Sequence, residues 1–338
     1  MVENQKPQIK VENLLKKFPV EKGFFKRVVG HIKAVNRLNF KIDMGEVLGL
    51  VGESGCGKTT LGQTILRAME PDDGKIYFNF GNGELQNIME MSKREFRSYR
   101  RYMQMIFQDP FSSLDPRKTI LDIVGEPLKV NNIARGKELE NRVREVVASA
   151  GLNVEHIRRF PHAFSGGQRQ RIAIARALAP NPRFVVADEP VSALDVSVRA
   201  EILNLFKDLQ EELELTILFI AHDLSVVRYI SDRVAVMYVG KMVEIAETRE
   251  LYFNPQHPYT EVLMSAIPVP DPRVDKERKI LEGEVPSASN PPAGCYFHPR
   301  CEYSQDICQK QTPELEEIRE DHYAACHFAD KLTLRGVK

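Results

Sequence analysis

A glycine-rich stretch of eight residues sets the strongest limit on how this chain folds. It reads Gly52-Glu53-Ser54-Gly55-Cys56-Gly57-Lys58-Thr59, and it lies between the apolar run Val47-Leu48-Gly49-Leu50-Val51 and the run Thr60-Leu61-Gly62-Gln63-Thr64-Ile65-Leu66. This order predicts a strand, a tight loop and a helix, with backbone N–H groups of the loop pointing inward at an anion. The sequence therefore predicts an α/β fold that contains a phosphate-binding loop.

The side chains of the loop fit ATP or another nucleoside triphosphate with Mg²⁺. Lys58 is expected to reach the β- and γ-phosphates, and Thr59 is expected to ligate magnesium. The residues expected to contact the nucleotide are Gly52, Ser54, Gly55, Cys56, Gly57, Lys58, Thr59 and Thr60. Cys56 precedes a helix, an environment that lowers the pKa of a thiol, so bound nucleotide would protect it from alkylation; a small residue without a role is the alternative.

Five further motifs follow the loop along the chain. They are Met105-Ile106-Phe107-Gln108-Asp109-Pro110, Phe164-Ser165-Gly166-Gly167-Gln168-Arg169-Gln170-Arg171, Phe184-Val185-Val186-Ala187-Asp188-Glu189-Pro190, Ser192-Ala193-Leu194-Asp195 and Leu218-Phe219-Ile220-Ala221-His222-Asp223. This series resembles the ATP-binding cassette (ABC) ATPases over about residues 8–245. The resemblance implies a P-loop ABC ATPase domain at residues 1–250, with a RecA-like mixed sheet, an antiparallel β portion and a helical subdomain at about 95–178.

Helical spacing of apolar residues appears in two places. One set is Leu139, Val143, Val146, Val147 and Ala150, followed by Gly151 as a stop signal, and it resembles the helical subdomain that docks on a membrane protein. The other set is Val198, Ile202, Leu205, Phe206, Leu209 and Leu213. The second helix is expected to cover the central sheet.

The motif around Asp188 carries the chemistry of hydrolysis. Asp188 ends an apolar run, which places its carboxylate at the edge of the sheet, where it can hold magnesium-bound water. The resemblance implies that Glu189 is the general base for the attacking water and that Gln108 touches both that water and magnesium. His222 is similar to the family's γ-phosphate switch; a histidine satisfied in the core or at the surface is the alternative.

The motif that begins at Ser165 implies a second copy of the cassette. In the family, the residues matching Ser165, Gly166, Gly167 and Gln168 contact the γ-phosphate bound on the opposite subunit, so two ATP molecules lie between two cassettes. Asp195 is expected at the same interface. A simple helix cap is the alternative interpretation of the Ser-Gly-Gly turn.

The residue that stacks on adenine is expected near the N-terminus. Phe18 occupies the position of the family's aromatic residue ahead of the first strands, while Phe24 and Phe25 are competing candidates in a stretch that is longer than usual, from Glu21 to His31. An aromatic residue that only packs in the core is the alternative.

Composition limits the partners. Lysine plus arginine and aspartate plus glutamate both number 47, so the net charge is zero and no nucleic-acid footprint is indicated. No apolar run is long enough to span a bilayer, and no signal peptide is present. A membrane role is therefore expected to be peripheral, on the cytoplasmic face and through partner subunits.

The chain changes character after about residue 250. Ten of its 20 prolines lie between Pro255 and Pro313, and four of its five cysteines are Cys295, Cys301, Cys308 and Cys326. This composition predicts a small loop-rich domain at residues 251–338 with a four-cysteine metal site. Disulfides are disfavoured in a reducing compartment, whereas zinc, with His298, His322 and His327 as spare ligands, and a four-iron, four-sulfur (4Fe–4S) cluster both fit.

A second resemblance narrows the family. His257-Pro258-Tyr259-Thr260, Gly283 to Pro286 and Cys295 to Cys301 are similar to the C-terminal extension of dipeptide and oligopeptide importer ATPases, a group that includes nickel importers. The resemblance implies a 4Fe–4S cluster on the four cysteines, as a structural staple or as a redox element. It also implies a second ATPase subunit, identical or different, two membrane permeases and an external substrate-binding protein.

The predicted function is ATP hydrolysis by two associated cassettes that powers peptide import. Nickel or another solute is the alternative cargo. Two other classes remain: a soluble ABC ATPase of DNA repair or translation, and a nucleotide-gated iron–sulfur sensor. The chain lacks the coiled-coil insertion and the second cassette that distinguish the soluble classes.

Overall fold

The computed structural model describes residues 6–23, 27–267 and 283–337. The chain divides into two compact units, and each is described by itself. Unit 1 comprises Met1–Lys10, Lys41–Val47 and Ile76–Ile220, and unit 2 comprises Val11–Phe40, Leu48–Lys75 and Ala221–Lys338. Phe24 and Phe25, two candidates for adenine stacking, lie outside the described residues.

Unit 2 contains five strands in the order β11-β12-β10-β9-β3. Their bounds are β3 Val47–Val51, β9 Arg233–Tyr238, β10 Lys241–Glu247, β11 Glu316–Arg319 and β12 His322–Ala324. Strand β3 runs parallel to β9, and the remaining pairs are antiparallel. All five residues of β3 are buried, as expected for the apolar run that precedes the glycine loop.

The C-terminal extension is rich in loops, as predicted, and also contains two short strands. Strand β12 pairs with β10 through Glu244 opposite Ala324 and Ile245 opposite Tyr323. Glu244 is fully buried, and its carboxylate accepts hydrogen bonds from the backbone N–H groups of Gln256 and His257 at 2.7 and 3.0 Å. The extension therefore adds two short strands to the sheet of unit 2, which the sequence did not predict.

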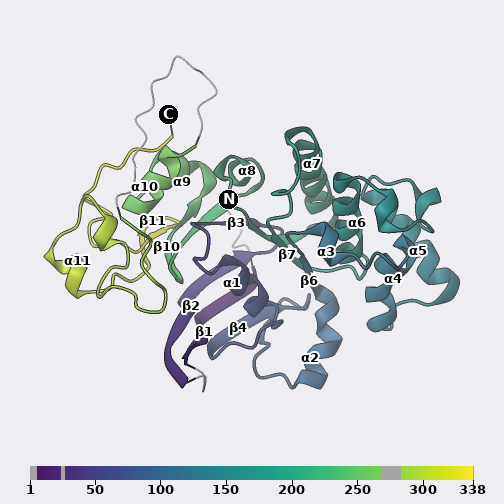
Figure 1. The fold of residues 1–338 in the computed structure, drawn as a ribbon, viewed down its shortest axis with the longest axis horizontal. Coiled ribbons are helices and arrows are strands. Elements are labelled where there is room, and N and C mark those ends of the chain that lie inside the picture. The colour runs from purple at the N-terminus through teal and green to yellow at the C-terminus, as the bar shows by residue number, and fades with distance from the viewer. Residues whose placement is uncertain (1–5, 24–26, 268–282, 338) are drawn as a thin grey trace, which may run out of the picture. The chain divides into compact units, whose positions relative to one another are not determined.

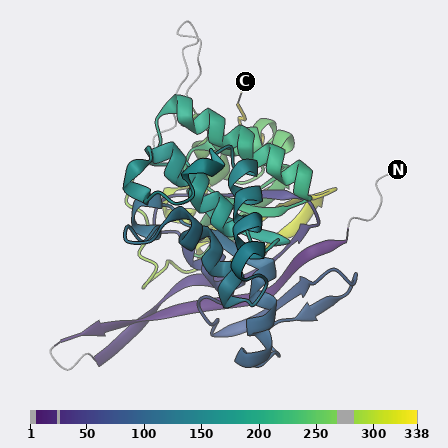
Figure 2. The same cartoon turned by 90° about the vertical axis from the view of Figure 1, so that its right-hand side faces the viewer.

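The other elements of unit 2 are short helices and a long hairpin (Figures 1 and 2). The helices are α1 Lys58–Ile65, α8 Leu224–Ile230, α9 Thr248–Phe253, α10 Pro258–Ser265 and α11 Asp306–Lys310. The hairpin pairs β1, Pro7–Lys22, with β2, Arg27–Asp43, and most of its residues belong to this unit.

Unit 1 contains three parallel strands in the order β8-β7-β6. Their bounds are β6 Met103–Ile106, β7 Phe184–Asp188 and β8 Thr216–Ile220. Every residue of β7 and β8 is buried, which explains their continuous apolar sequences. Helix α7, Val196–Leu213, connects β7 to β8 and buries Ile202, Leu205, Phe206 and Leu209 as its spacing predicted. Val198 is half-buried and Leu213 is exposed, so the two ends of the predicted apolar face are not fully covered.

Three helices of unit 1 share a buried apolar cluster and are coloured teal in Figure 1. They are α4 Ile120–Val130, α5 Gly136–Ser149 and α6 Gly166–Leu178; the short helix α3, Pro110–Ser113, precedes them. The buried cluster extends from Leu114 to Ala179. The range of about 95–178 predicted for the helical subdomain also contains strand β6. Helix α5 ends at Ser149, as the glycine stop signal predicted, and Gly151 has a φ of +71°.

Unit 1 also contains α2 Lys93–Tyr99, β5 Leu85–Asn87 and most of β4 Asp73–Asn79. Across the described parts of both units, no helix combines the length and the apolar character needed to cross a membrane.

Candidate functional site

The backbone of the glycine loop has a conformation that only glycine fits at two positions. Gly52 has a φ of +149°, and a Cβ atom there would lie 2.1 Å from the carbonyl oxygen of Met237. Gly57 has a φ of +109°, and its Cβ atom would lie 2.0 Å from the carbonyl oxygen of Ala34. The loop packs against its own unit too closely for any side chain at these two positions.

Lys58 is the first residue of α1, and its side chain turns back into the loop. The residue is 7% exposed, and its Nζ donates to the carbonyl oxygens of Gly52 at 2.8 Å and Glu53 at 3.1 Å. The loop therefore holds an ammonium group among backbone dipoles, next to the N-terminal end of a helix. This arrangement suits an anionic ligand.

Cys56 differs from the expectation for a residue before a helix. The thiol is buried, and this burial raises its pKa above the usual value of 9.0, although Lys58 nearby acts in the opposite direction. The prediction of a lowered thiol pKa is therefore wrong, because desolvation outweighs the helix end and the ammonium group.

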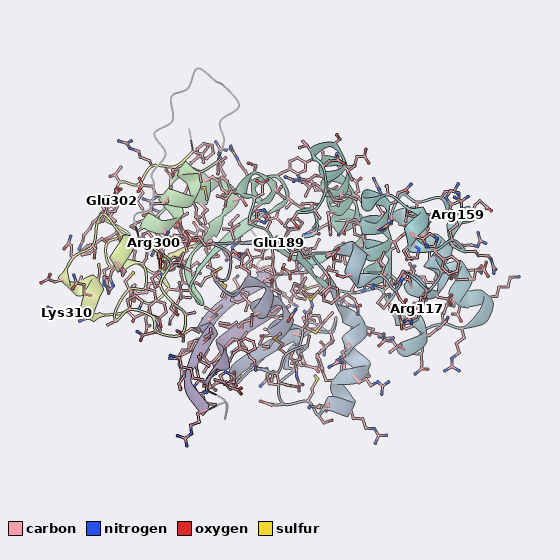
Figure 3. The ribbon with its side chains drawn as sticks, in the orientation of Figure 1. Arg117, Arg159, Glu189, Arg300, Glu302 and Lys310 are labelled. Carbon is pink, nitrogen blue, oxygen red and sulfur yellow. The ribbon has the colours of Figure 1, made fainter. Side chains whose placement is uncertain are left out.

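In unit 1, the acidic pair lies at the end of β7. Asp188 is the last residue of the strand and is 4% exposed. Glu189, labelled in Figure 3, turns out of the strand with a φ of +47°, and its backbone N–H donates to the carbonyl of Ile220 at 2.9 Å. The side-chain Nε2 of Gln108 donates to Oε2 of Glu189 at 3.0 Å, so the structure brings together these two predicted residues.

The glycine motif begins helix α6 with a capping box. Ser165 Oγ accepts from the N–H of Gln168 at 3.3 Å, and Gln168 Oε1 accepts from the N–H of Ser165 at 3.0 Å. Both residues are exposed. Asp195 caps α7 in the same way by accepting from Val198 N–H at 3.0 Å. The helix-cap interpretation thus holds for this motif, and the role toward a second cassette stays a prediction.

The remaining predicted nucleotide contacts lie in different surroundings. His222 follows β8 by two residues and is exposed. Phe18 is half-buried inside strand β1, whereas the sequence placed it ahead of the first strands; Lys16 Nζ lies 5.6 Å from its ring centroid. Stacking of adenine on Phe18 stays a prediction.

The four cysteines of the extension line one small cavity of about 20 Å³. The segments that carry Cys295 and Cys308 are joined by a backbone hydrogen bond of 2.8 Å. They approach this closely because Gly294, with a φ of +69°, has no Cβ; that atom would lie 2.2 Å from the carbonyl oxygen of Cys308. All five cysteines of the chain are free thiols.

Burial is the main cause that raises the thiol pKa values around this cavity. The pKa of Cys301 rises to about 11 and that of Cys326 to about 12, and that of Cys295 also rises. Negative charge on neighbouring cysteines adds to each rise, because the thiols lie close to one another. Such thiols stay protonated at neutral pH unless a cation compensates their charge.

The histidines proposed as zinc ligands have other partners. A ring nitrogen of His298 lies 2.8 Å from the carbonyl of Cys295, His327 lies 2.9 Å from that of Gln311, and His322 lies 2.8 Å from Glu244. Within residues 6–23, 27–267 and 283–337, no three cysteine, histidine or acidic side chains form a ready metal-binding group. The cysteines therefore share one cavity without forming a complete ligand set.

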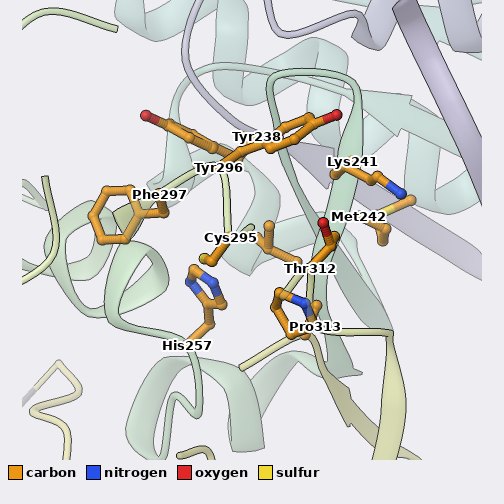
Figure 4. A pocket seen from close by; sticks show the side chains of 11 residues that line it. Tyr238, Lys241, Met242, His257, Cys295, Tyr296, Phe297, Thr312 and Pro313 are labelled. Carbon is orange, nitrogen blue, oxygen red and sulfur yellow. The ribbon is translucent and has the colours of Figure 1, made fainter. Parts of the chain in front are cut away.

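A second cavity of about 30 Å³ borders Cys295 and is lined by aromatic residues of the sheet and the extension (Figure 4). The ring of Phe297 lies 5.3 Å from that of Tyr238 on β9 and 5.4 Å from that of Tyr259. His257 contributes to both cavities, and its burial lowers its pKa to about 3, so it is neutral. The cysteine segment is thus anchored by aromatic packing on the sheet of unit 2.

Sequence reasoning missed two residues of unit 2 that contact the glycine loop. The guanidinium of Arg300 pairs with the carboxylate of Glu53, and the hydroxyl of Tyr259 accepts from the N–H of Glu53 at 2.8 Å. Arg300 and Glu53 are 247 positions apart, and no local pattern marks such a pair. The only available signal was the position of Arg300 directly before Cys301.

A glycine loop that opens a helix with a buried lysine, and an acidic pair that closes a buried parallel strand, define the P-loop nucleoside triphosphatases. Comparison with known families is more specific. The family profile described as "ABC transporter" matches residues 35–192, and the one described as "Oligopeptide/dipeptide transporter, C-terminal region" matches residues 243–308.

Two curated relatives match nearly the whole chain. Oligopeptide transport ATP-binding protein AppF of Bacillus subtilis is 50% identical over 328 residues, which are 96% of this chain and 98% of that protein. A putative peptide import ATP-binding protein of Brucella ovis is 52% identical over 87% of this chain and 92% of its own length.

Solved structures agree with this match. The dimeric ATP-binding cassette MJ0796 bound to ADP and Pi has a TM-score of 0.62 at 30% identity, over 71% of this chain and 99% of that one. The cbiO1 protein of Clostridium perfringens, part of the ABC transporter complex cbiONQ, has a TM-score of 0.61 at 27% identity, over 73% and 91%. The chain belongs to the ATP-binding proteins of the ABC transporter family. The predicted fold class and the ATPase class are confirmed.

Proposed function

We propose that this chain is the ATP-hydrolysing subunit of an importer for dipeptides or oligopeptides. The observation that carries the proposal is the 50% identity to an oligopeptide transport ATP-binding protein over 96% of the chain, which includes the C-terminal extension. Nickel or another solute remains the alternative cargo, because the cargo does not contact this subunit.

The residues of the two units have distinct tasks in the proposed reaction. Lys58 and the N–H groups of the glycine loop would bind the phosphates. Thr59 and Asp188 are each expected to be a ligand of Mg²⁺, which would supply neutralisation of charge on the phosphate oxygens. Glu189 accepts a proton from the water whose oxygen attacks the γ-phosphorus, and ADP leaves with the electrons of the broken bond. The hydrogen bond from Gln108 to Glu189 supports a shared task in orienting that water.

The exposed cap of helix α6 supports the proposed association of two cassettes. Ser165 and Gln168 present polar atoms to solvent at a helix N-terminus, where a second cassette could offer its triphosphate. We expect the complete assembly to contain a second ATPase subunit, two membrane permeases and an external binding protein. This chain would then lie on the cytoplasmic face of the membrane, in contact with the permeases.

The four cysteines are proposed to be the ligands of a 4Fe–4S cluster. Three observations fit such a cluster: four thiols line one cavity, burial raises the thiol pKa of Cys295, Cys301 and Cys326, and the nearby histidines have other partners. Zinc held by the same four cysteines is the alternative. Iron would compensate the charge of the thiolates and join four segments of the extension. With all four cysteines used as ligands, the proposed role is structural.

Two experiments test these proposals. In cells that lack the gene for this chain, uptake of labelled peptides should be lost, and should return with wild-type protein but not with Lys58→Ala. Loss of nickel uptake alone would overturn the peptide assignment.

The second experiment tests the cluster. Protein purified without oxygen should contain iron and acid-labile sulfide in equal amounts. Colourless protein with one zinc per chain would instead establish zinc.

A further inference from the structure

Glu53 is the only acidic residue of the glycine loop, and its side chain forms an ion pair with Arg300 of the C-terminal extension. Arg300 Nη1 donates to Glu53 Oε2 at 3.0 Å, and Nη2 donates to Oε1 at 3.2 Å. This two-pronged geometry is the strong form of an arginine–carboxylate pair. The side chains are 7% exposed for Arg300 and 25% for Glu53, so solvent screens the pair only partly.

The surroundings of Arg300 fix it in place. Its Nη1 also donates to the hydroxyl of Tyr238 at 3.3 Å, and the ring of Tyr238 packs 4.6 Å from that of Tyr259. Tyr259 in turn accepts from the backbone N–H of Glu53. Glu53 is therefore held through its backbone and through its carboxylate, by two residues that meet at Tyr238.

Tyr259 and Arg300 both depend on the fold of the extension. The backbone N–H of Tyr259 donates to Nδ1 of the buried His257, which caps the N-terminus of helix α10. Arg300 ends the short helical turn His298–Arg300 and directly precedes Cys301, one of the cysteines that line the cavity. Figure 3 labels Arg300, Glu302 and Lys310 on the C-terminal part of the ribbon.

The charge of Glu53 matters for the ligand of the loop. A carboxylate beside a loop that binds a triphosphate repels it, unless a cation neutralises the carboxylate. We propose that Arg300 is a positioning residue for the nucleotide site. By holding Glu53, Arg300 keeps the glycine loop in its phosphate-binding shape and compensates the negative charge of the carboxylate. This inference rests on the proposed binding of ATP by the loop.

The test measures ATP affinity and KM for a set of variants of the full chain. Arg300→Gln is expected to weaken ATP binding and to raise KM by about tenfold, with little change in kcat, because the partly buried carboxylate of Glu53 loses its partner. Glu53→Gln alone should change the affinity by less than about threefold, and the double variant should return to within about threefold of wild type. The defect of Arg300→Gln should shrink at high salt, because salt screens the repulsion.

Arg319→Gln is the matched control. Arg319 belongs to the same extension and pairs with Glu250 at 3.2 Å, but its side chain is 57% exposed. This variant should bind ATP as the wild type does. If Arg300→Gln fails to fold, the double variant and Arg300→Lys replace it, and thermal melting checks their folding. Arg300→Lys keeps the positive charge, and the double variant removes both charges, so neither leaves Glu53 without a compensating charge and both should bind ATP within about threefold of wild type.

The outcomes separate the inference from the function on which it rests. Loss of binding in Lys58→Ala together with wild-type affinity in Arg300→Gln would overturn only the positioning role. Failure of Glu53→Gln to rescue Arg300→Gln would also overturn it, because Arg300 would then act without Glu53. Wild-type ATP affinity in Lys58→Ala would overturn the nucleotide site itself, and the inference with it.

Discussion

The side-chain amide of Gln108 donates a hydrogen bond of 3.0 Å to the carboxylate of Glu189. Gln108 lies two residues after strand β6 and Glu189 one residue after β7, and these strands are parallel neighbours. Parallel pairing thus places an amide and a carboxylate at the same edge of the sheet of unit 1, where side chains of functional sites gather.

This contact predicts the effect of removing the amide. Gln108→Ala should lower kcat for ATP hydrolysis by about 10- to 100-fold, because the general base loses a group that orients it. The affinity for ATP should change little, since the phosphates are expected to bind the glycine loop. A parallel loss of binding would contradict the proposed division of tasks.

Ser165 allows the cap and the interface roles to be separated. Ser165→Ala should cost about 1 kcal/mol of stability through the lost cap. Ser165→Asp keeps the cap, because aspartate is a good N-cap residue, but under the proposed association it would direct a carboxylate toward the triphosphate of the other cassette. We expect Ser165→Asp to melt as the wild type does and to lose hydrolysis by about 100-fold in the assembled pair of cassettes. Full activity of the aspartate variant would contradict the interface role of Ser165 and leave helix capping as its only role.

The raised pKa of Cys56 predicts slow alkylation of its thiol. The thiolate is the reactive form, so burial should make the reaction slower than that of a free thiol at pH 8, with the rate rising about tenfold per pH unit through pH 9. Peptide mapping by mass spectrometry after timed iodoacetamide treatment measures this rate, with denatured protein as the reference. A rate that levels off below pH 9 would show that the thiol pKa is not raised.

Two glycines of the extension offer a matched test of the cysteine cavity. Gly294→Ala should destabilise the chain by about 3 kcal/mol, because the added Cβ meets a carbonyl oxygen in a left-handed backbone. Gly283 has a φ of +83°, but its nearest neighbour is an Arg300 side-chain carbon at 4.0 Å. Gly283→Ala should therefore cost only about 1 kcal/mol, from the backbone alone.

The same pair of variants reports on metal binding. Gly294→Ala should lower the iron content of protein purified without oxygen, because it separates the Cys295 and Cys308 segments, while Gly283→Ala should keep it. Equal iron content in both variants would show that this close approach is not needed for a metal site.

Sequence patterns predicted the strands and helices next to the candidate site because each carries a local signature. The apolar run ending at Asp188 is strand β7, with the predicted last residue, and Ser165 caps the N-terminus of helix α6 as the Ser-Gly-Gly turn indicates. A strand, its terminal acid and a helix cap are all decided within a few residues, so their prediction needs no knowledge of distant contacts.

The missing parts depend on contacts between distant residues. Strands β11 and β12 have four and three residues, too short for an alternating pattern, and they form by pairing with each other and with β10. The pair of Glu53 and Arg300 joins segments that only the folded sheet brings together. The prediction of a lowered pKa for Cys56 was wrong for a similar reason, because the burial of the thiol depends on residues that are distant in the sequence.

The most direct test of the account is a single-turnover assay of the chain with its partner cassette, with and without Glu189→Gln. The wild type should release phosphate, while the variant should bind ATP with Mg²⁺, hold it unhydrolysed between the cassettes, and turn over about 1,000-fold more slowly, because glutamine cannot accept the proton of the attacking water. Hydrolysis by the variant at the wild-type rate would contradict the assignment of Glu189 as the general base and the mechanism built on it.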